Sequence, residues 1–599
     1  MAEASVEHPS NHNSPSCQAY VDKQRDPHEL RHLRNDVEGV TFAATADTTE
    51  NLFRDELGLL PDLPSHRVET LESALSLVTK FAQTSQRTHN EPHKPDLRVD
   101  VAVPDQVPAE VFFLLLNCDR EHRNLCHWPD HISVDTLERM CKVLGQGTAS
   151  LRTETEYKVC VFSKAFAYIN RWLRICAPGP MTATFQRSLD LYAAACLKHL
   201  KQLDLISPPN LATLQALLCG AGLVSLLGKT SQAWSLTALA SRLAINLHYH
   251  TLTQETLNRP GFTEVRHFVY WCYYMDKTLS TILIRPSSLP NLRVDPTSLV
   301  SASKETSLSS KIEIMVKLAQ IQDLALPLVT KTSGATSIEV SALVDRLEEK
   351  LYGIRENIDQ LSPSWSSTPA LQVELDGIYF MYYSVFTTLL RLHPASLHDP
   401  RKRGTCLQYA RNALLSMGQL RSYIESPTNT GTDYVSWSII LYPLTPFFIV
   451  FCNVVATSNQ EDVALLRAVT DVMGLINENC STGRCLHNLF SQFVDLCSRI
   501  DSNHDKDPYQ DNSIRNDENR GLDVRMQSSK DATTSFQNLS GVGLSFRAPY
   551  VTYDTPAENS LEEGTLYDRS IWDDSLMLQL FNTQPSIDWF EPTVHTAVN

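Results

Sequence analysis

The stretch that decides the fold is 211–295, LATLQALLCGAGLVSLLGKTSQAWSLTALASRLAINLHYHTLTQETLNRPGFTEVRHFVYWCYYMDKTLSTILIRPSSLPNLRVD. In three successive patterns, its apolar residues recur three or four positions apart, the spacing that places side chains on one face of an α-helix. They are Leu214, Leu217, Leu218, Ala221 and Val224, then Leu236, Leu239, Ala240, Leu243 and Leu247, then Val265, Phe268, Val269, Cys272, Met275, Leu279 and Ile282. Each apolar face must be buried against another helix, so the stretch predicts an all-α, multi-helix bundle.

The breaks between these patterns set the expected helix boundaries. The first helix closes at Gly228, and Pro260-Gly261 separates the second helix from the third. The third helix is expected to stop at Arg285-Pro286, because the residue before a proline is pushed out of the α region. A short extended run then leads to residue 295. The boundaries predict three helices in a row with no strand between them.

The rest of the chain divides by composition into a helical centre and polar ends. Helical periodicity extends over 63–500, which predicts one all-helical domain. Residues 1–62 are polar and predict a disordered segment, and residues 501–557 predict a flexible linker. Residues 558–599 form an acidic tail that is also rich in aromatic residues. The apolar fraction of 42% is slightly below the usual globular range, which fits a chain that is only partly packed.

Charge and cysteine spacing narrow the functional classes. The net charge of −16 disfavours contact with phosphate unless basic residues are segregated. The densest basic run, 401–403, is short, and a solvated loop is a better interpretation of it than a nuclear-import signal. None of the 14 cysteines forms a C-x-x-C pair, which favours reduced, buried thiols in an intracellular protein. The N-terminus shows no secretory signal pattern.

One segment needs to be weighed as a membrane span. Residues 437–456 are uncharged and very apolar. Pro443 and Pro446 lie near the centre of this segment, Asn453 follows, and no basic cluster flanks it. These features favour a buried helix that begins or kinks at the prolines, and no membrane span is predicted.

Two groups of metal-ligating residue types occur in the sequence, and neither predicts a metal site. The segment 28–32, HELRH, has the H-E-x-x-H pattern of zinc proteases, but its flanks are charged and no third ligand is apparent. The second group matches no standard zinc module and is interrupted by a Trp-Pro pair, so we expect packing cysteines with surface histidines. Its members are Cys118, His122, Cys126, His127 and His131.

No motif for catalysis or for a cofactor is present. The sequence has no P-loop and no G-x-S-x-G pattern, and Gly145-Gln146-Gly147 lacks both a third glycine and a preceding strand. Aromatic residues within 379–386 could line a ligand pocket, but at helical spacing they more often fill a core. We therefore expect no enzyme, no catalytic residue and no cofactor.

The tail, 558–599, interleaves acidic residues with aromatic and aliphatic ones. The acids keep such a segment hydrated while its aromatic side chains remain available to a partner's groove, as in an acidic activation segment. The alternative is that 571–581 packs on the bundle as a terminal helix, and the sequence leaves both open. Under the first interpretation, the residues expected to contact the transcription machinery are Trp572, Leu576, Phe581, Trp589 and Phe590.

The central stretch resembles a known family. Residues 214–248 are similar to the helical pair at the centre of the fungal-specific transcription factor regulatory domain, the middle homology region of binuclear zinc cluster proteins. Residues 264–280, EVRHFVYWCYYMDKTLS, followed by an Arg-Pro pair, resemble the most recognisable motif of that domain. The motif residues, to which the resemblance assigns a structural role, are Arg242, Arg266, Trp271, Asp276, Arg285 and Pro286.

Two features depart from the family pattern. Ile284 stands where a glycine usually precedes the Arg-Pro pair. The family's N-terminal zinc cluster has six cysteines, beginning with a C-x-x-C pair, with basic residues nearby that contact DNA. Here Cys17 is the only cysteine before Cys118, so that module is missing from the sequence. The chain either acts through a DNA-binding partner or is a fragment of a longer gene product.

The resemblance implies a nuclear regulator of a set of target genes, such as metabolic or biosynthetic genes. Its partners would be promoter DNA, contacted directly or through a DNA-binding protein, and the transcription machinery; a dimer is one of the oligomeric states left open. Within the bundle, Asp276 is expected to pair with Arg242, Arg266 or Arg285, since an unpaired buried carboxylate is costly. The alternative function is a non-transcriptional helical scaffold or a ligand-sensing protein. A metal-dependent enzyme is a distant third.

Overall fold

The regular structure of the protein is helical throughout the described residues. The computed structural model describes residues 67, 69–74, 76–77, 103–116, 131–175, 182–227, 229–301, 307–329, 334–366, 369–397, 399–424, 441–442, 444–476 and 481–504. No strand occurs in these ranges, which confirms the predicted all-α class. The N-terminal segment 1–62, the linker beyond residue 504 and the tail 558–599 lie outside them.

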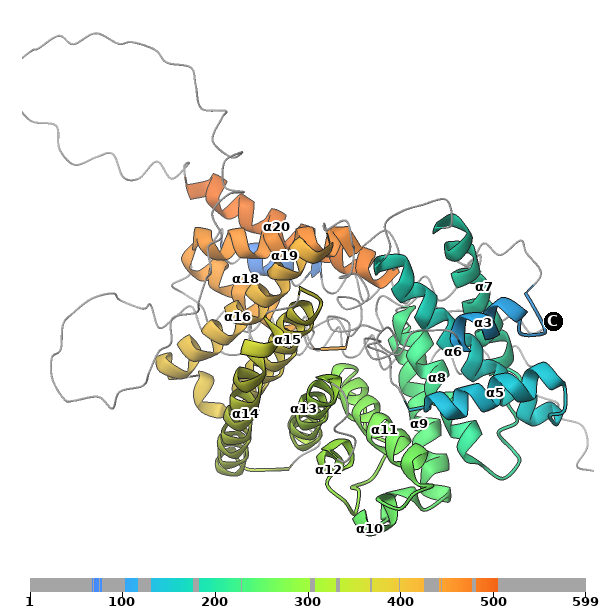
Figure 1. The fold of residues 1–599 in the computed structure, drawn as a ribbon. Helices are drawn as coiled ribbons and strands as arrows, with labels where there is room; N and C mark the ends of the chain where they lie inside the picture. The colour runs from blue at the N-terminus through green and yellow to red at the C-terminus, as the bar shows by residue number, and fades with distance from the viewer. Residues whose placement is uncertain are drawn as a thin grey trace, which may run out of the picture. The chain divides into compact units, whose positions relative to one another are not determined.

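Figure 1 shows the described helices, which occur along the chain in the following order. The first group is α3 (Ala109–Leu116), α5 (Val134–Gln146), α6 (Leu151–Ile175), α7 (Thr182–Leu200), α8 (Leu211–Leu226), α9 (Thr230–Asn246), η1 (Tyr249–Thr251), α10 (Gln254–Leu257) and α11 (Thr263–Ile282). The second is α12 (Pro296–Ser301), α13 (Ser307–Val329), α14 (Ser337–Trp365), α15 (Pro369–Leu392), η2 (Pro394–Leu397), α16 (Pro400–Ile424), α18 (Thr445–Thr457), α19 (Gln460–Ile476) and α20 (Ser481–His504).

Helix α8 lies between two hydrophobic clusters. Leu214, Leu217 and Leu218 belong to a large cluster that extends through α11, α13, α15, α16 and α18. Ala216 and Cys219, on another face of α8, belong to a smaller cluster formed with α3, α5, α6 and α7. Residues 213–225 are therefore buried all around the helix. Asn210 begins α8 by accepting a hydrogen bond from the backbone N–H of Thr213 at 2.9 Å.

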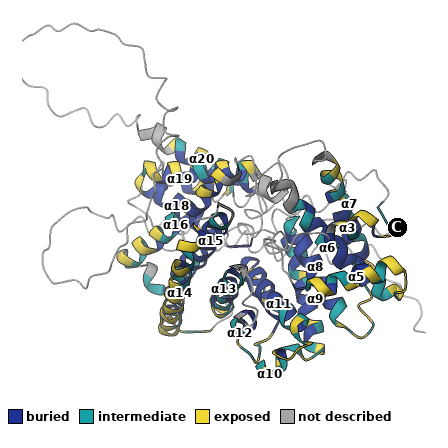
Figure 2. Cartoon of the chain, viewed as in Figure 1, coloured by how far each residue is buried: buried dark blue, intermediate teal, exposed yellow. Residues whose placement is uncertain are grey.

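Helix α11 is also enclosed by its neighbours. Every residue from Phe268 to Ile282 is buried, and the helix is dark blue along most of its length in Figure 2. It begins directly after Pro260-Gly261, as predicted, and ends at Ile282, somewhat ahead of the expected stop at Arg285. Residues 283–295 continue as an irregular segment without strand structure.

The apolar segment 437–456 contributes a buried helix. Helix α18 carries Pro446 in its first turn, where the missing N–H has no intrahelical partner to lose. Phe447 stacks on Phe490 of α20 with ring centroids 3.8 Å apart, and Phe451 packs edge-on against Phe493. None of the helices in the described part of the chain has the length and hydropathy needed to cross a membrane.

Two local predictions were incomplete or wrong. Helix α5 was not predicted, although Ser133 caps its N-terminus and Gly147, with φ of 62°, caps its C-terminus. The basic run 401–403 is not a loop but lies in the first turn of α16. Lys402 forms an ion pair with Asp345 of α14 at 3.3 Å, so a tertiary contact supports helical structure there.

His199, near the end of α7, is a buried titratable group in the smaller cluster. Its ring stacks on Phe162 with centroids 6.0 Å apart, and its Nδ1 lies 3.0 Å from Oε1 of Gln202. Its Nε2 is buried with no hydrogen-bond partner among the described residues. Burial is the main cause that lowers the pKa of His199, and the positive charges of Lys158 and Lys198 lower it further.

The lowered pKa of His199 predicts a loss of stability on acidification. Below about pH 6.5 the unfolded chain binds a proton that the folded chain does not, so the free energy of unfolding decreases as the pH falls. We expect His199→Phe, which retains the ring stacking, to reduce the decrease in thermal midpoint between about pH 6.5 and 5. Above about pH 7.5 the two proteins should show parallel dependence on pH. Equal acid sensitivity of both proteins would contradict the assignment.

Candidate functional site

A group of charged side chains that includes two buried ones lies in the family motif, around Lys277 of α11. This side chain is 1% exposed. Its Nζ is 3.0 Å from Oδ1 of Asp323 in α13, and it donates hydrogen bonds to Oγ of Ser287 at 3.0 Å and to the carbonyl oxygen of Leu289 at 2.7 Å. An ammonium group has three donors, and these three contacts use all of them.

Asp276, the neighbour of Lys277, binds the backbone of the segment that contains Ser287 and Leu289. Its carboxylate accepts hydrogen bonds from the N–H groups of Ser288 at 2.9 Å and Leu289 at 3.0 Å, and it lies 3.5 Å from Nζ of Lys277. Burial raises the pKa of Asp276, whereas the charge of Lys277 and the two backbone hydrogen bonds lower it. Two adjacent side chains of α11 thus fix the conformation of 287–289.

The expected pairing of Asp276 with an arginine was wrong. Its partners are Lys277 and two backbone N–H groups. The expectation rested on charge alone. In the structure the chain turns back after α11, so that its own backbone N–H groups reach the carboxylate. Backbone donors and an adjacent lysine satisfy a buried carboxylate as well as a guanidinium can.

The same group of residues joins α11 to α13. Tyr273 donates its hydroxyl to Oδ2 of Asp323 at 3.4 Å, and Nζ of Lys277 lies 5.5 Å from the centre of the Tyr273 ring. One residue beyond Lys277, Thr278 donates to Oε1 of Gln322 at 3.2 Å. We call Tyr273, Asp276, Lys277, Asp323 and the segment 287–289 the lysine clasp. Its donors and acceptors bind one another, so its role is to hold α11, α13 and the segment 287–289 together.

Arg285 makes a second set of contacts just before the clasp segment. Its guanidinium carbon lies 5.0 Å from the centre of the Trp234 ring in α9, and its Nη1 donates to Oγ of Ser231 at 2.7 Å. Nε1 of Trp234 in turn donates to Oγ of Ser280 at 3.1 Å. These contacts tie the end of α11 and the following Arg-Pro pair to the start of α9.

The departure from the family glycine at Ile284 has a backbone consequence. Ile284 has φ of 53°, in the left-handed region that a β-branched residue rarely adopts. Its N–H donates to the carbonyl oxygen of Thr281 at 3.3 Å, and the N–H of Arg285 donates to Ser280 at 2.9 Å. This is the hydrogen-bonding that ends a helix at a left-handed residue, the position where glycine is preferred.

The remaining motif residues do not converge on these contacts. Trp271 is 3% exposed and packs in the large cluster, with ring centroids 5.9 Å from Tyr270 and 5.8 Å from Tyr274. Arg266 is half-buried on α11, and Arg242 is exposed on α9. Of the six motif residues, the structure therefore connects Asp276 with the clasp, Arg285 with α9 and Pro286 with Ser280 of α11. The other three lie elsewhere on α9 and α11.

The sequence patterns did not predict that Lys277, Asp323 and Ser287 belong to this site. One signal was available for the lysine. The charged pair Asp276-Lys277 lies in the stretch 268–282, whose other residues are uncharged, so its two charges had to be met inside the protein. No spacing in the sequence pointed to Asp323, because that contact depends on how α13 packs on α11.

A third polar group links α11 to the helices of the smaller cluster. Nε2 of Gln215 in α8 donates to Oε2 of Glu264 at 2.7 Å and to the carbonyl oxygen of His131 at 3.3 Å. The N–H of Ser133, which caps α5, donates to Oε1 of Glu264 at 3.0 Å. Glu264, the first residue of the family motif, thereby connects α11 with α8 and α5.

His131, from the second candidate metal group, is a buried residue and not a surface histidine. It is fully buried, with Nε2 3.0 Å from the carbonyl oxygen of Gln215 and 3.6 Å from Sγ of Cys219. Nε2 close to a carbonyl oxygen indicates the tautomer that carries its proton there, which leaves this nitrogen unable to bind a metal. The other members, at 118–127, and the segment 28–32 lie outside the described residues. Within the described ranges, no three His, Cys, Asp or Glu side chains form a metal-binding group.

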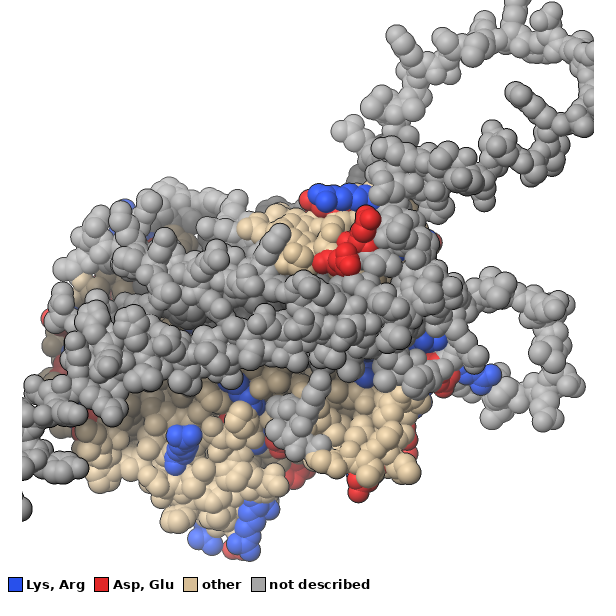
Figure 3. All heavy atoms as spheres, turned by 180° about the vertical axis from the view of Figure 1, so that it is seen from behind, with Lys and Arg blue, Asp and Glu red and all other residues tan. Residues whose placement is uncertain are grey.

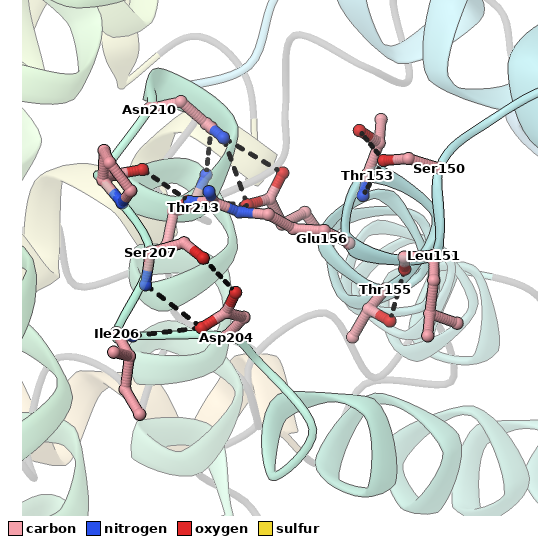
Figure 4. A network of polar contacts seen from close by, with 12 residues as sticks. Ser150, Leu151, Thr153, Thr155, Glu156, Asp204, Ile206, Ser207, Asn210 and Thr213 are labelled. Atoms are coloured by element: carbon pink, nitrogen blue, oxygen red, sulfur yellow. Dashed lines mark hydrogen bonds and ion pairs between the residues drawn. The ribbon is translucent and has the colours of Figure 1, made fainter.

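A polar network joins α6 to the connection between α7 and α8 (Figure 4). Glu156 is 2% exposed and accepts hydrogen bonds from Nε of Arg152 at 3.0 Å, Oγ1 of Thr213 at 2.6 Å and Nδ2 of Asn210 at 3.2 Å. Arg152 also donates to the carbonyl oxygen of Pro208 at 2.8 Å. The buried carboxylate is thus satisfied from three sides, and it fixes the start of α8 against α6.

One cluster has the composition of a catalytic triad but not its geometry. His393 lies 3.0 Å from Oγ of Ser341 and 3.2 Å from Oδ1 of Asp345, and both distances are to Nε2. In a triad the carboxylate binds the opposite ring nitrogen from the serine. Here Nδ1 accepts the N–H of Ala395 at 3.0 Å, so Nε2 carries the proton and cannot take one from Ser341.

The aromatic residues of α15 fill the interior between α14, α15 and α16. Tyr382 and Phe386 are buried, and Phe386 packs on Tyr409 of α16 with ring centroids 4.2 Å apart. Arg355 of α14 covers the outer rings, with its guanidinium carbon 5.0 Å from the centre of the Tyr379 ring. These contacts support the interpretation of the run as core.

These contacts define the class of protein. It is a helical domain in which buried polar groups hold the helices together. Residues 167–368 match the family described as the fungal specific transcription factor domain, and the chain therefore carries such a domain. The match runs from within α6 to just beyond α14, and it includes the lysine clasp.

The chain is also similar to two individual proteins. The chain is 23% identical over 316 residues to an uncharacterized transcriptional regulatory protein of Schizosaccharomyces pombe. That alignment covers 49% of this chain and 47% of the relative, so it spans about half the length of either protein. The solved structure of the K. lactis CBF3 core is similar with a TM-score of 0.43 and 13% identity, over 73% of this chain and 93% of that one.

The lysine clasp predicts a large cost for removing its cation. Lys277→Met leaves Asp276 buried without its positive neighbour, and we expect a loss of about 3–5 kcal/mol in the free energy of unfolding. Arg259→Met is a suitable control, because it removes an exposed i,i+4 pair with Glu255 and should cost less than about 0.5 kcal/mol. Urea unfolding of both variants tests this. Equal losses of unfolding free energy in the two variants would contradict a stabilising role for the buried charge of Lys277.

The left-handed backbone of Ile284 predicts that glycine is more stable than alanine at this position, which is the reverse of the usual order of stability. At ordinary helical positions glycine is less stable than alanine by about 0.5–1 kcal/mol. At φ of 53° we expect Ile284→Gly to melt higher than Ile284→Ala, since both lose the same packing but only alanine retains the left-handed cost of about 1–2 kcal/mol. Asn258, a helix end with φ of −83°, is the matched position and should show the usual order. The thermal midpoints of the four variants decide the matter.

Proposed function

We propose that this chain is a nuclear regulator of transcription that acts through its helical domain. The observation that carries the proposal is the match of 167–368 to the fungal specific transcription factor domain. The lysine clasp and the Arg285 contacts supply a structural reason for the motif residues that lie within it. The name of the S. pombe relative, a transcriptional regulatory protein, supports the same role, and we expect a regulator and not an enzyme.

The proposal for DNA is that promoter contact depends on a DNA-binding partner. The chain carries a net charge of −16, which opposes binding to phosphate without a segregated basic surface. On the face drawn in Figure 3, the visible lysines and arginines are scattered, and several lie beside acidic residues. The densest basic run, 401–403, lies in the first turn of α16, and Lys402 within it is paired with Asp345. These features support recruitment through another protein.

The proposal for activation rests on the acidic tail, 558–599. Its acidic residues alternate with aromatic ones, which is the pattern of segments that dock aromatic side chains into coactivator grooves. The five side chains assigned to this contact are Trp572, Leu576, Phe581, Trp589 and Phe590. Activation would then be separable from the folding of the helical domain.

A tethering experiment tests the proposal. When the full chain is fused to an unrelated DNA-binding domain in yeast, we expect reporter expression that is lost on deletion of 558–599. Alanine at Trp572, Phe581 and Trp589 together should cause most of that loss, because these changes remove aromatic contacts and leave the tail's charge unchanged. Deletion of 501–557, which removes a polar segment of comparable length, is the control and should preserve activation.

Chromatin occupancy of the tagged chain separates the remaining outcomes. Promoter-specific occupancy that disappears with one DNA-binding partner would support a co-regulator. Occupancy that survives loss of each candidate partner would refute recruitment and require direct DNA contact. Absence of both occupancy and tethered activation would favour the helical scaffold or ligand sensor.

A further inference from the structure

The connection between α7 and α8 presents an unusual serine. Residues 201–210 read KQLDLISPPN, and after a turn at its start this segment is irregular up to Asn210, which caps α8. Ser207 is followed by two prolines, and the preceding Ile206 is 98% exposed. Asp204 holds the segment in place by accepting the N–H of Ile206 at 3.1 Å and of Ser207 at 3.2 Å (Figure 4). The hydroxyl of Ser207 donates to the other oxygen of the same carboxylate.

We propose that Ser207 is a phosphorylation site for a proline-directed serine/threonine kinase. In the reaction, Oγ of Ser207 attacks the γ-phosphorus of ATP, the bond from that phosphorus to the β-phosphate oxygen breaks, and ADP leaves. The hydroxyl proton passes to the catalytic base of the kinase. The inference does not depend on the proposed transcriptional role, because it rests on the sequence and geometry of this segment alone.

The fold distinguishes Ser207 from the other described hydroxyls that precede a proline. A kinase must place the substrate oxygen in line with the γ-phosphate, which requires a chain segment that can enter its cleft. Ser362-Pro363 lies inside α14, where access would require unwinding the helix. Thr445-Pro446 is buried in the first turn of α18. Ser207 lies in an irregular segment, and exposing its oxygen breaks one surface hydrogen bond.

The surroundings of Ser207 predict what a phosphate would do. Phosphorylation removes the hydroxyl donor to Asp204 and places a charge of about −2 beside that carboxylate. Hydrogen bonds from Ser207 and Ile206 lower the pKa of Asp204, and the positive charge of Arg152 lowers it further, which places Arg152 within electrostatic range of the segment. The repulsion should open the turn made by Asp204.

Arg152 connects the segment to the buried carboxylate of Glu156. Its guanidinium donates both to Glu156, at 3.0 Å, and to the carbonyl oxygen of Pro208, the residue after Ser207. A phosphate on Ser207 therefore competes with Glu156 for the same cation. Glu156 would keep only Thr213 and Asn210 of the partners shown in Figure 4, which weakens the start of α8. Phosphorylation is thus coupled to the helix between the two hydrophobic clusters.

Phosphorylation in vitro tests the site. The full chain, native or heat-denatured, is incubated with ATP, Mg²⁺ and a purified mitogen-activated protein kinase, and phosphopeptides are mapped by mass spectrometry. We expect Ser207 to be modified in the native chain, Ser362 only in the denatured chain, and loss of the Ser207 signal in Ser207→Ala and Pro208→Ala. Modification of Ser207 only after denaturation, or not at all, would overturn the proposal.

Hydrogen exchange tests the coupling through Arg152. In the phosphorylated chain we expect faster amide exchange in 201–216 than in the untreated chain, with α14 unchanged as the internal control. Ser207→Ala treated with the same kinase should show no such change. Ser207 phosphorylated in the native chain with unaltered exchange at 201–216 would refute the competition between the phosphate and Glu156.

Discussion

The charge of Lys277 constrains the centre of this structure. An ammonium group without access to water costs several kcal/mol in desolvation unless acceptors surround it. The protein supplies them from three parts of the chain: Asp276 beside it, Asp323 on α13, and the backbone and side chain of 287–289. These acceptors can meet only if α13 packs on α11 and the chain turns back directly after α11. A single buried cation thus couples a helix-helix interface to the path of the loop that follows.

Helix α8 connects the large hydrophobic cluster, which contains α11, to the smaller one. It buries Leu214, Leu217 and Leu218 in the large cluster and Ala216, Cys219 and Leu223 in the smaller one. Small residues let helices approach closely, and at Gly220 an added Cβ would lie 2.6 Å from Leu200 of α7. The hydrogen bonds from Gln215 to Glu264 and to His131 run across the same helix. A helix buried on all sides cannot move without disturbing both clusters.

The extent to which the sequence predicted this structure differs between helices and polar contacts. Periodicity located α8, α9 and α11 because an apolar stripe needs only the local 3.6-residue repeat. Helix α5 was missed although Val134, Leu137, Met140 and Leu144 recur at helical spacing, and its caps, Ser133 and Gly147, were a second signal. The family resemblance identified Asp276 and Arg285 as structural, but neither it nor the spacing gave their partners. Partners such as Ser288, Leu289 and Trp234 depend on tertiary geometry, which a one-dimensional pattern does not contain.

The burial of the motif residues restricts the positions at which regulation can act on the domain. Asp276, Lys277 and Trp271 are buried and engaged in packing, so their substitution changes stability and lowers every activity of the chain together. Such variants cannot distinguish an activator from a repressor or a scaffold. A change that redirects function without unfolding the domain must act at exposed positions linked to the buried network. The segment 201–210 has that property, because Arg152 contacts both its backbone and the buried carboxylate that holds α8. Regulation through that segment would leave the lysine clasp intact while altering the helix that joins the two clusters.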